Sequence, residues 1–210
     1  MGGVATVGPG RHHALYPPQR DIAGFGLIVV VETTMTDMSR YAAFLRGVNV
    51  GGVNLKMAEV AQAFDEAGFT NVRTILASGN VLFESRSGVD AVRQKAETAL
   101  RGAFGYDAWV LAYEIGAIAE ISRNYPFQRE VEGHHSYVTF VTDETVLDEL
   151  AALGSQAGPD EKIKPGKGVI YWQVPKTGTL DTTIGKTMGK KRYKSSTTTR
   201  NLRTIDKVLR

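Results

Sequence analysis

The order of predicted strands and helices in residues 39–113 limits the possible folds more than any other feature of this chain. Four short apolar runs have the length of strands, and two longer segments repeat their apolar residues with helical spacing. The strands are expected at 41–46, 72–76, 81–84 and 109–112, and the helices at 57–67 and 89–103. The order β-α-β-β-α-β is that of a ferredoxin-like unit, an antiparallel sheet with two helices. The sequence therefore predicts an α+β protein whose first small subdomain, residues 39–113, is ferredoxin-like.

Residues 114–210 predict a second small α+β subdomain that ends in a basic helix. Apolar runs indicate strands at 137–141 and 169–174, and helical spacing recurs near 114–123, at 146–151, at 180–188 and from about 201 to 209. The segment 154–167 is rich in glycine, proline and polar residues, which is typical of a loop. Fewer strands can be placed from the sequence in this half than in the first, and no short sequence repeat is visible.

Residues 1–38 are expected to be an extension outside the fold. Their apolar run, 22–31, is too short to span a bilayer, so no membrane segment is predicted. A signal sequence is the alternative, because Arg11 and Arg20 precede the run, but no small-residue cleavage pattern follows it. Met35 and Met38 stand just before the first predicted strand, and either could be the natural start of translation.

The composition excludes several kinds of site. The chain has no cysteine, which rules out disulfides, thiolate metal sites and cysteine nucleophiles and fits a cytoplasmic protein. The histidine pairs at 12–13 and 134–135 have no carboxylate or thiol at ligand spacing, so no metal site is predicted.

The charge is distributed unevenly along the chain. The net charge is +3, but residues 186–210 carry nine basic residues and one acid, whereas residues 1–185 carry 16 basic and 21 acidic residues. A cationic end on an acidic body favours a phosphate-bearing ligand or nucleic acid. A solvated basic helix beside an acidic face is the structural alternative.

A glycine-rich run at 45–52 joins the first predicted strand to the first helix. Its backbone amides could form a nest around an anion, with an arginine as the counter-charge. The candidate ligand-binding residues here are Arg46, Asn49, Gly51, Gly52 and Lys56. The alternative is a plain connection whose asparagine braces a turn. The glycine spacing matches neither a dinucleotide fingerprint nor a Walker A loop, so no cofactor is predicted.

Two further polar blocks complete the candidate site. Ser78 and Asn80 lie in a predicted hairpin turn, and a plain turn is the alternative interpretation. In a ferredoxin-like unit the first and third strands are antiparallel neighbours, which would bring Arg46 and Asn49 close to Asn80. The C-terminal block adds Lys186, Thr199, Arg200 and Asn201.

Three groups of residues resemble the signature of one bacterial family, in the same order and at ordinary spacing. They are Leu45-Arg-Gly-Val-Asn-Val-Gly-Gly52 with Lys56-Met57, Ala77-Ser-Gly-Asn-Val-Leu-Phe83, and Thr198-Thr-Arg-Asn201 with Thr204. The family is domain-of-unknown-function family 1697, and the resemblance covers about residues 39–210. It implies two α+β subdomains, the first ferredoxin-like, and it implies no activity. The family usually has tryptophan after the last block, where this chain has Leu202.

The sequence leaves two functions open. The first is a binding protein that recognises a small anionic, phosphate-bearing ligand or nucleic acid through these blocks. The alternative is an enzyme on a small phosphorylated or carboxylated metabolite, in which Arg46, Lys186 and Arg200 clamp the anion. Its catalytic residues are unknown, with Glu84 and Asp181 as candidate bases. An enzyme needs a titrating base beside the clamp in a closed pocket, whereas a binding protein needs only an open basic surface.

A chain that starts at Met38 should fold as stably as the full chain, because the preceding residues pair with no later pattern. We expect the two melting temperatures to agree within about 5 °C, which for a domain of this size corresponds to little more than 1 kcal/mol. A larger fall, measured by thermal unfolding, would show that the extension contributes to the fold.

Overall fold

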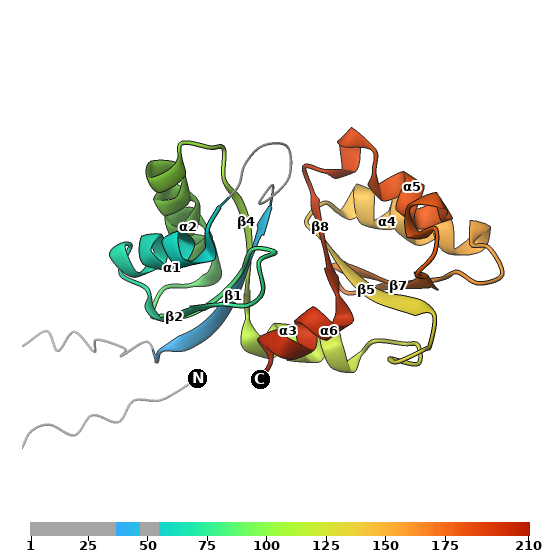
Figure 1. The fold of residues 1–210 in the computed structure, drawn as a ribbon, viewed down its shortest axis with the longest axis horizontal. Helices are drawn as coiled ribbons and strands as arrows, with labels where there is room; N and C mark the ends of the chain where they lie inside the picture. The colour runs from blue at the N-terminus through green and yellow to red at the C-terminus, as the bar shows by residue number, and fades with distance from the viewer. Residues whose placement is uncertain (1–36, 47–54) are drawn as a thin grey trace, which may run out of the picture. The chain divides into compact units, whose positions relative to one another are not determined.

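The first sheet is formed by the strands predicted for the first half of the chain. In the computed structural model, which describes residues 37–46 and 55–210, it has four antiparallel strands in the order β2-β3-β1-β4. The strands are β1 (Ser39–Arg46), β2 (Thr70–Thr74), β3 (Asn80–Ser85) and β4 (Trp109–Glu114). The helices α1 (Met57–Glu66) and α2 (Val89–Phe104) cover one face (Figure 1). This topology confirms the ferredoxin-like prediction.

Strand β1 is apolar along most of its length because both faces of the first sheet are covered. Tyr41, Ala43 and Leu45 pack into a core with α1 and α2. Ala42 and Phe44 point to the opposite face and join a different core. Side chains alternate between the faces of a strand, so a strand buried on both faces must be apolar at successive positions.

The second half contains a second four-stranded sheet with the same topology. Its strand order is β6-β7-β5-β8, which repeats the order of the first sheet. The strands are β5 (His134–Val141), β6 (Lys162–Gly166), β7 (Val169–Pro175) and β8 (Thr197–Asn201). The helices α4 (Glu144–Ala152) and α5 (Thr183–Met188) pack on one face of it (Figure 1). The two halves are therefore two copies of one βαββαβ unit.

Two strands of the second half could not be placed from the sequence. The segment 154–167, expected to be a loop, contains β6, and the Thr197–Asn201 block forms β8. Strand β6 lies at the edge of the sheet, where a proline such as Pro165 is tolerated because one side of the strand needs no ladder bonds. Strand β8 is polar, and its three threonines favour a strand through their branched Cβ atoms rather than through an apolar pattern.

A further helix follows the last strand of each unit. Helix α3 (Ile115–Arg123) follows β4, and α6 (Leu202–Val208) follows β8. Short 3-10 turns occur at Leu153–Gln156, Thr179–Asp181 and Lys191–Tyr193. In the described part of the chain, no helix combines the length and the apolar character needed to cross a membrane.

The strand registers define which residues of the two units are equivalent. Phe44 pairs with Asn80 in the first sheet, and Phe140 pairs with Val169 in the second. In the strand pairs β1–β4 and β5–β8, Ala42 lies opposite Tyr113 and Val138 lies opposite Arg200. The equivalent pairs are therefore Phe44 with Phe140, Gly79 with Gly168, and Tyr113 with Arg200.

A shared core joins the two units. It is formed by the sheet faces that α1, α2, α4 and α5 leave uncovered, together with residues of α3 and α6. At its centre the rings of Phe44 and Phe140 lie 4.8 Å apart. Ile118 of α3 and Ile205 of α6 are both fully buried in this core. The described residues, 37–46 and 55–210, therefore form one compact unit around it.

Truncating either Ile118 or Ile205 to alanine should destabilise the whole unit. Each change leaves a cavity in the shared core, so we expect each to cost about 2–5 kcal/mol in the free energy of unfolding. Leu180→Ala is the control, because Leu180 is 78% exposed. Chemical denaturation would contradict this account if the isoleucine variants were no less stable than the Leu180 variant.

Candidate functional site

The structure brings four of the sequence-predicted residues to one place. Arg46 ends β1, Ser78 and Asn80 belong to the β2–β3 hairpin, and Arg200 reaches them from β8. The expected antiparallel pairing of β1 with β3 is confirmed, and Leu45 N donates to Gly79 O over 2.7 Å. Asn49, Gly51 and Gly52 lie outside the described residues.

The guanidinium of Arg200 is buried and uses all its N–H groups within the protein. Nε donates to the side chain of Asn80 over 2.6 Å, and the terminal nitrogens donate mainly to backbone carbonyls. The other acceptors are Leu45 O, Gly79 O, Thr198 Oγ1 and Thr199 O. The guanidinium also lies over the Phe44 ring, 5.1 Å from its centroid. Arg200 thus ties β8 to β1 and β3 of the other sheet.

The charge of Arg200 is held by neutral groups. No carboxylate of the described residues forms an ion pair with it. Burial lowers the pKa of Arg200 to about 10, so the side chain remains a cation at neutral pH. Asn80 is itself fully buried and also donates to Ile75 O and Ser78 Oγ. The arginine and asparagine therefore brace the interior rather than face a ligand.

Arg46 differs from Arg200 in its surroundings. Its guanidinium lies over the Trp109 ring, 5.2 Å from the centroid. Partial burial lowers the pKa of Arg46. No ion pair of Arg46 is present among the described residues, so this cation remains a candidate for an anionic ligand.

The remaining predicted residues do not join this group. Lys56 is exposed and pairs with Glu59. Asn201 accepts a hydrogen bond from Arg203 N and caps α6, and Thr199 bonds the hydroxyl of Thr139. Lys186 lies on α5, which packs against the face of the second sheet opposite the shared core. The predicted set is therefore divided among different surfaces.

A cavity of about 660 Å³ lies between α3 and the β6–β7 hairpin. Its volume is within the range of small-molecule sites in proteins. Apolar and aromatic residues form half of its lining, namely Tyr113, Ala117, Ile121, Pro126, Val141, Pro165 and Tyr171. Its polar side chains include Lys164, Lys167 and Glu120. The cavity is thus an apolar hollow with two cations and one acid at its wall.

Tyr113 is a polar group of this wall with an unused hydroxyl. Burial raises the pKa of Tyr113 to about 12, so the hydroxyl keeps its proton at neutral pH. Within the described chain no hydrogen-bond partner contacts it, whereas the Tyr171 hydroxyl donates to Ile121 O over 3.0 Å. Burial and the charge of Glu120 raise the pKa of Tyr171 as well. Tyr113 is therefore the tyrosine free to donate to a ligand.

Glycines shape the hairpin side of the cavity. A Cβ atom at Gly166 would lie 2.5 Å from Tyr171 Cε2, so only glycine lets the ring lie against the strand here. Gly168 has a φ of +66° and turns the chain into β7. The sequence prediction missed these residues. The available signal was the run Lys164-Pro-Gly-Lys-Gly168, in which one lysine belongs to β6 and the other to the tight turn that follows.

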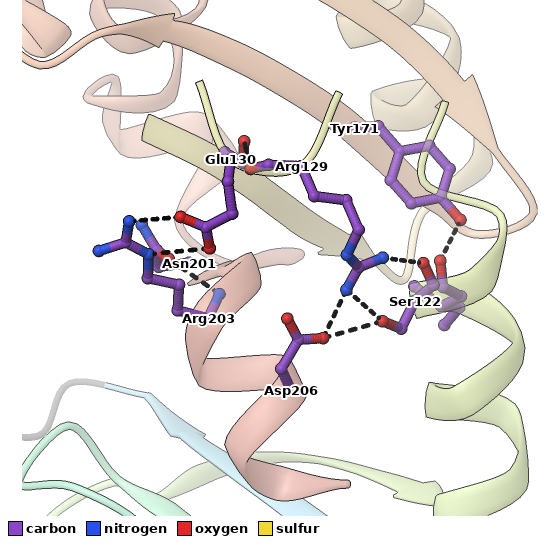
Figure 2. Close-up of polar contacts among 9 residues, drawn as sticks. Ser122, Arg129, Glu130, Tyr171, Asn201, Arg203 and Asp206 are labelled. Carbon is purple, nitrogen blue, oxygen red and sulfur yellow. Dashed lines mark hydrogen bonds and ion pairs between the residues drawn. The ribbon is translucent and has the colours of Figure 1, made fainter. Parts of the chain in front are cut away.

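A polar cluster fixes the helical side of the cavity. Arg129 donates to Ser122 O and Ser122 Oγ of α3 and to Asp206 of α6 (Figure 2). Tyr171 of β7 bonds the same end of α3, as Figure 2 also shows. These contacts hold α3 against the second unit, so the cavity wall is preformed.

Replacing Arg200 with lysine should destabilise the protein strongly. An ammonium group cannot reproduce the fork of N–H donors, so several buried acceptors would lose their partners. We expect a loss of about 3 kcal/mol in the free energy of unfolding. Arg203→Lys is the matched control, since Arg203 is exposed and pairs with exposed Glu130, and it should leave the free energy of unfolding almost unchanged. Equal denaturation midpoints for the two variants would contradict a bracing role for Arg200.

The comparisons with known proteins agree with this fold. The chain is similar to a conserved bacterial protein, SP0830 from Streptococcus pneumoniae, with a TM-score of 0.67 and 26% sequence identity. The match covers 81% of this chain and 97% of that one. No curated protein matches the sequence. A family model described as "Protein of unknown function (DUF1697)" matches residues 38–171, and the chain therefore belongs to the DUF1697 family.

Proposed function

We propose that this protein binds a small anionic ligand in the cavity between α3 and the β6–β7 hairpin. The observation that carries the proposal is the grouping of Lys164, Lys167 and the free hydroxyl of Tyr113 on the wall of an apolar hollow. Lysines and a protonated tyrosine are donors to phosphate or carboxylate. The apolar wall would hold the uncharged body of the ligand. The absence of cysteine supports action in the cytoplasm.

The cavity is favoured over the predicted Arg200 site because Arg200 has no N–H left for a ligand. Arg46 with the segment of Asn49, Gly51 and Gly52 remains a proposed second anion-binding element. Lys186, Lys190, Lys191 and Lys194 form no ion pair within the described residues, and they would be the surface for nucleic acid. The nucleic-acid proposal therefore concerns different residues from the cavity.

An enzymatic function would need a base beside the bound anion. Glu120 is the carboxylate that lines the cavity, so it is the candidate base of this alternative. Glu84 lies four residues along β3 from Asn80, about 13 Å at the usual rise of a strand, and it accepts a hydrogen bond from Asn71. Neither Glu84 nor Asp181 lines the cavity.

Phenyl phosphate is the probe for this proposal, because it combines an anion with a flat apolar ring. Calorimetric titration should show binding to the wild type. The double variant Lys164→Gln/Lys167→Gln should bind about tenfold or more weakly, which is about 1.4 kcal/mol of lost interaction. Tyr113→Phe should weaken binding by a smaller factor, since it removes one hydrogen bond.

Lys186→Gln/Lys190→Gln is the matched control, because it removes the same two charges from exposed positions outside the cavity. It should leave the affinity for phenyl phosphate unchanged. Unchanged affinity in the double variant, or an equal loss in the control, would contradict the cavity as the anion site. Binding of an oligonucleotide that weakens steeply with salt and depends on Lys186 would support the nucleic-acid alternative.

A further inference from the structure

The two units end their first strands in the same way. Gly79 and Gly168 are equivalent residues that immediately precede the third strand of each unit, with φ values of +70° and +66°. Leu45 N donates to Gly79 O over 2.7 Å, and Val141 N donates to Gly168 O over 2.9 Å. In a regular antiparallel ladder, two residues of a hydrogen-bonded pair exchange two backbone hydrogen bonds. The second bond here would run from the glycine N–H to the carbonyl oxygen of Leu45 or Val141. Among the described residues, Gly79 N does not donate to Leu45 O, and Gly168 N does not donate to Val141 O.

The first unit satisfies this carbonyl with a side chain. Arg200 Nη2 donates to Leu45 O over 2.9 Å while its guanidinium lies over the Phe44 ring. The equivalent position in the second unit is occupied by Tyr113, whose ring lies 4.9 Å from that of Phe140. Tyr113 therefore takes the place of the guanidinium over the aromatic ring. It provides no hydrogen bond to Val141 O.

The carbonyl of Val141 is left for another donor. Val141 and Gly168 both line the cavity, and a Cβ atom at Gly168 would lie 3.9 Å from Val141 O. No side chain of the described residues donates to Val141 O, in contrast to Leu45 O. A carbonyl beside an apolar cavity is a favourable acceptor for an N–H group that a ligand brings.

We infer that the ligand carries a planar N–H donor as well as an anion, and that the donor bonds Val141 O as Arg200 bonds Leu45 O. This inference rests on the proposed function, because the anion would be held by Lys164 and Lys167 of the same cavity. The chemical class is a guanidine, amidine or amide joined by a short apolar linker to a carboxylate or phosphate. The donor group of the ligand would correspond to the guanidinium of Arg200, which donates to Leu45 O.

Three probes separate the two ends of such a ligand. 4-Guanidinobutanoate has both groups, hexanoate has the anion alone, and butylguanidine has the donor alone. Calorimetric titration of the full chain should show 4-guanidinobutanoate binding at least about tenfold more tightly than either of the others. Equal affinity of hexanoate and 4-guanidinobutanoate would overturn the donor inference and leave the anion site standing. Failure of both carboxylates to bind would overturn the proposed function itself.

A variant can test the equivalence of the two units directly. Tyr113→Arg should place a guanidinium beside Val141 O, as Arg200 stands beside Leu45 O, and thereby fill the donor position. We expect 4-guanidinobutanoate to lose its advantage over hexanoate in this variant. Retention of the full advantage would overturn the inference. If the variant fails to fold, the comparison of the three probes on the wild-type protein still tests the donor inference independently.

Discussion

The contact between Arg200 and its neutral acceptors is the interaction on which the arrangement of the two sheets depends. A buried guanidinium without a carboxylate is costly unless every N–H finds a partner, and here each one does. Those partners belong to both units, since Asn80, Leu45 and Gly79 lie in the first and Thr198 in the second. The buried guanidinium of Arg200 needs a hydrogen-bond acceptor for each N–H group, and this need holds β8 against the end of β1.

The cavity lies at a position where the two units differ, with Tyr113 in the first unit equivalent to Arg200 in the second. The arginine of β8 closes the end of the first unit, whereas the tyrosine of β4 stands at the corresponding place and leaves the second unit open. Tyr113 does not donate a hydrogen bond to Val141 O. Among the described residues, this carbonyl and the Tyr113 hydroxyl therefore both lack a side-chain partner beside the apolar wall. Two lysines of the β6–β7 hairpin add charge to the same wall. Arg200 therefore occupies the position beside Leu45 O, whereas the equivalent carbonyl of Val141 lies at the cavity.

The first unit was predictable because its sequence carries strong local patterns. Strand β1 is a continuous apolar run, and α1 and α2 have clear helical spacing, so the order of elements could be read directly. The second unit was harder to predict because β6 contains Pro165 and exposed lysines and β8 is polar. Their strand geometry comes from pairing with β7 and β5 rather than from their own patterns.

The candidate site could be predicted only in part. The sequence pattern correctly indicated that the end of β1 approaches the β2–β3 hairpin, but it could not show that Arg200 is buried and fully bonded. The cavity was not predictable, because Tyr113 and Lys167 belong to different units and meet only through the shared core. An NMR titration of amide shifts with phenyl phosphate tests the cavity as the anion site most directly. If the cavity binds the anion, the largest changes fall in α3 and at residues 164–168. Changes confined to residues 186–194 would contradict it.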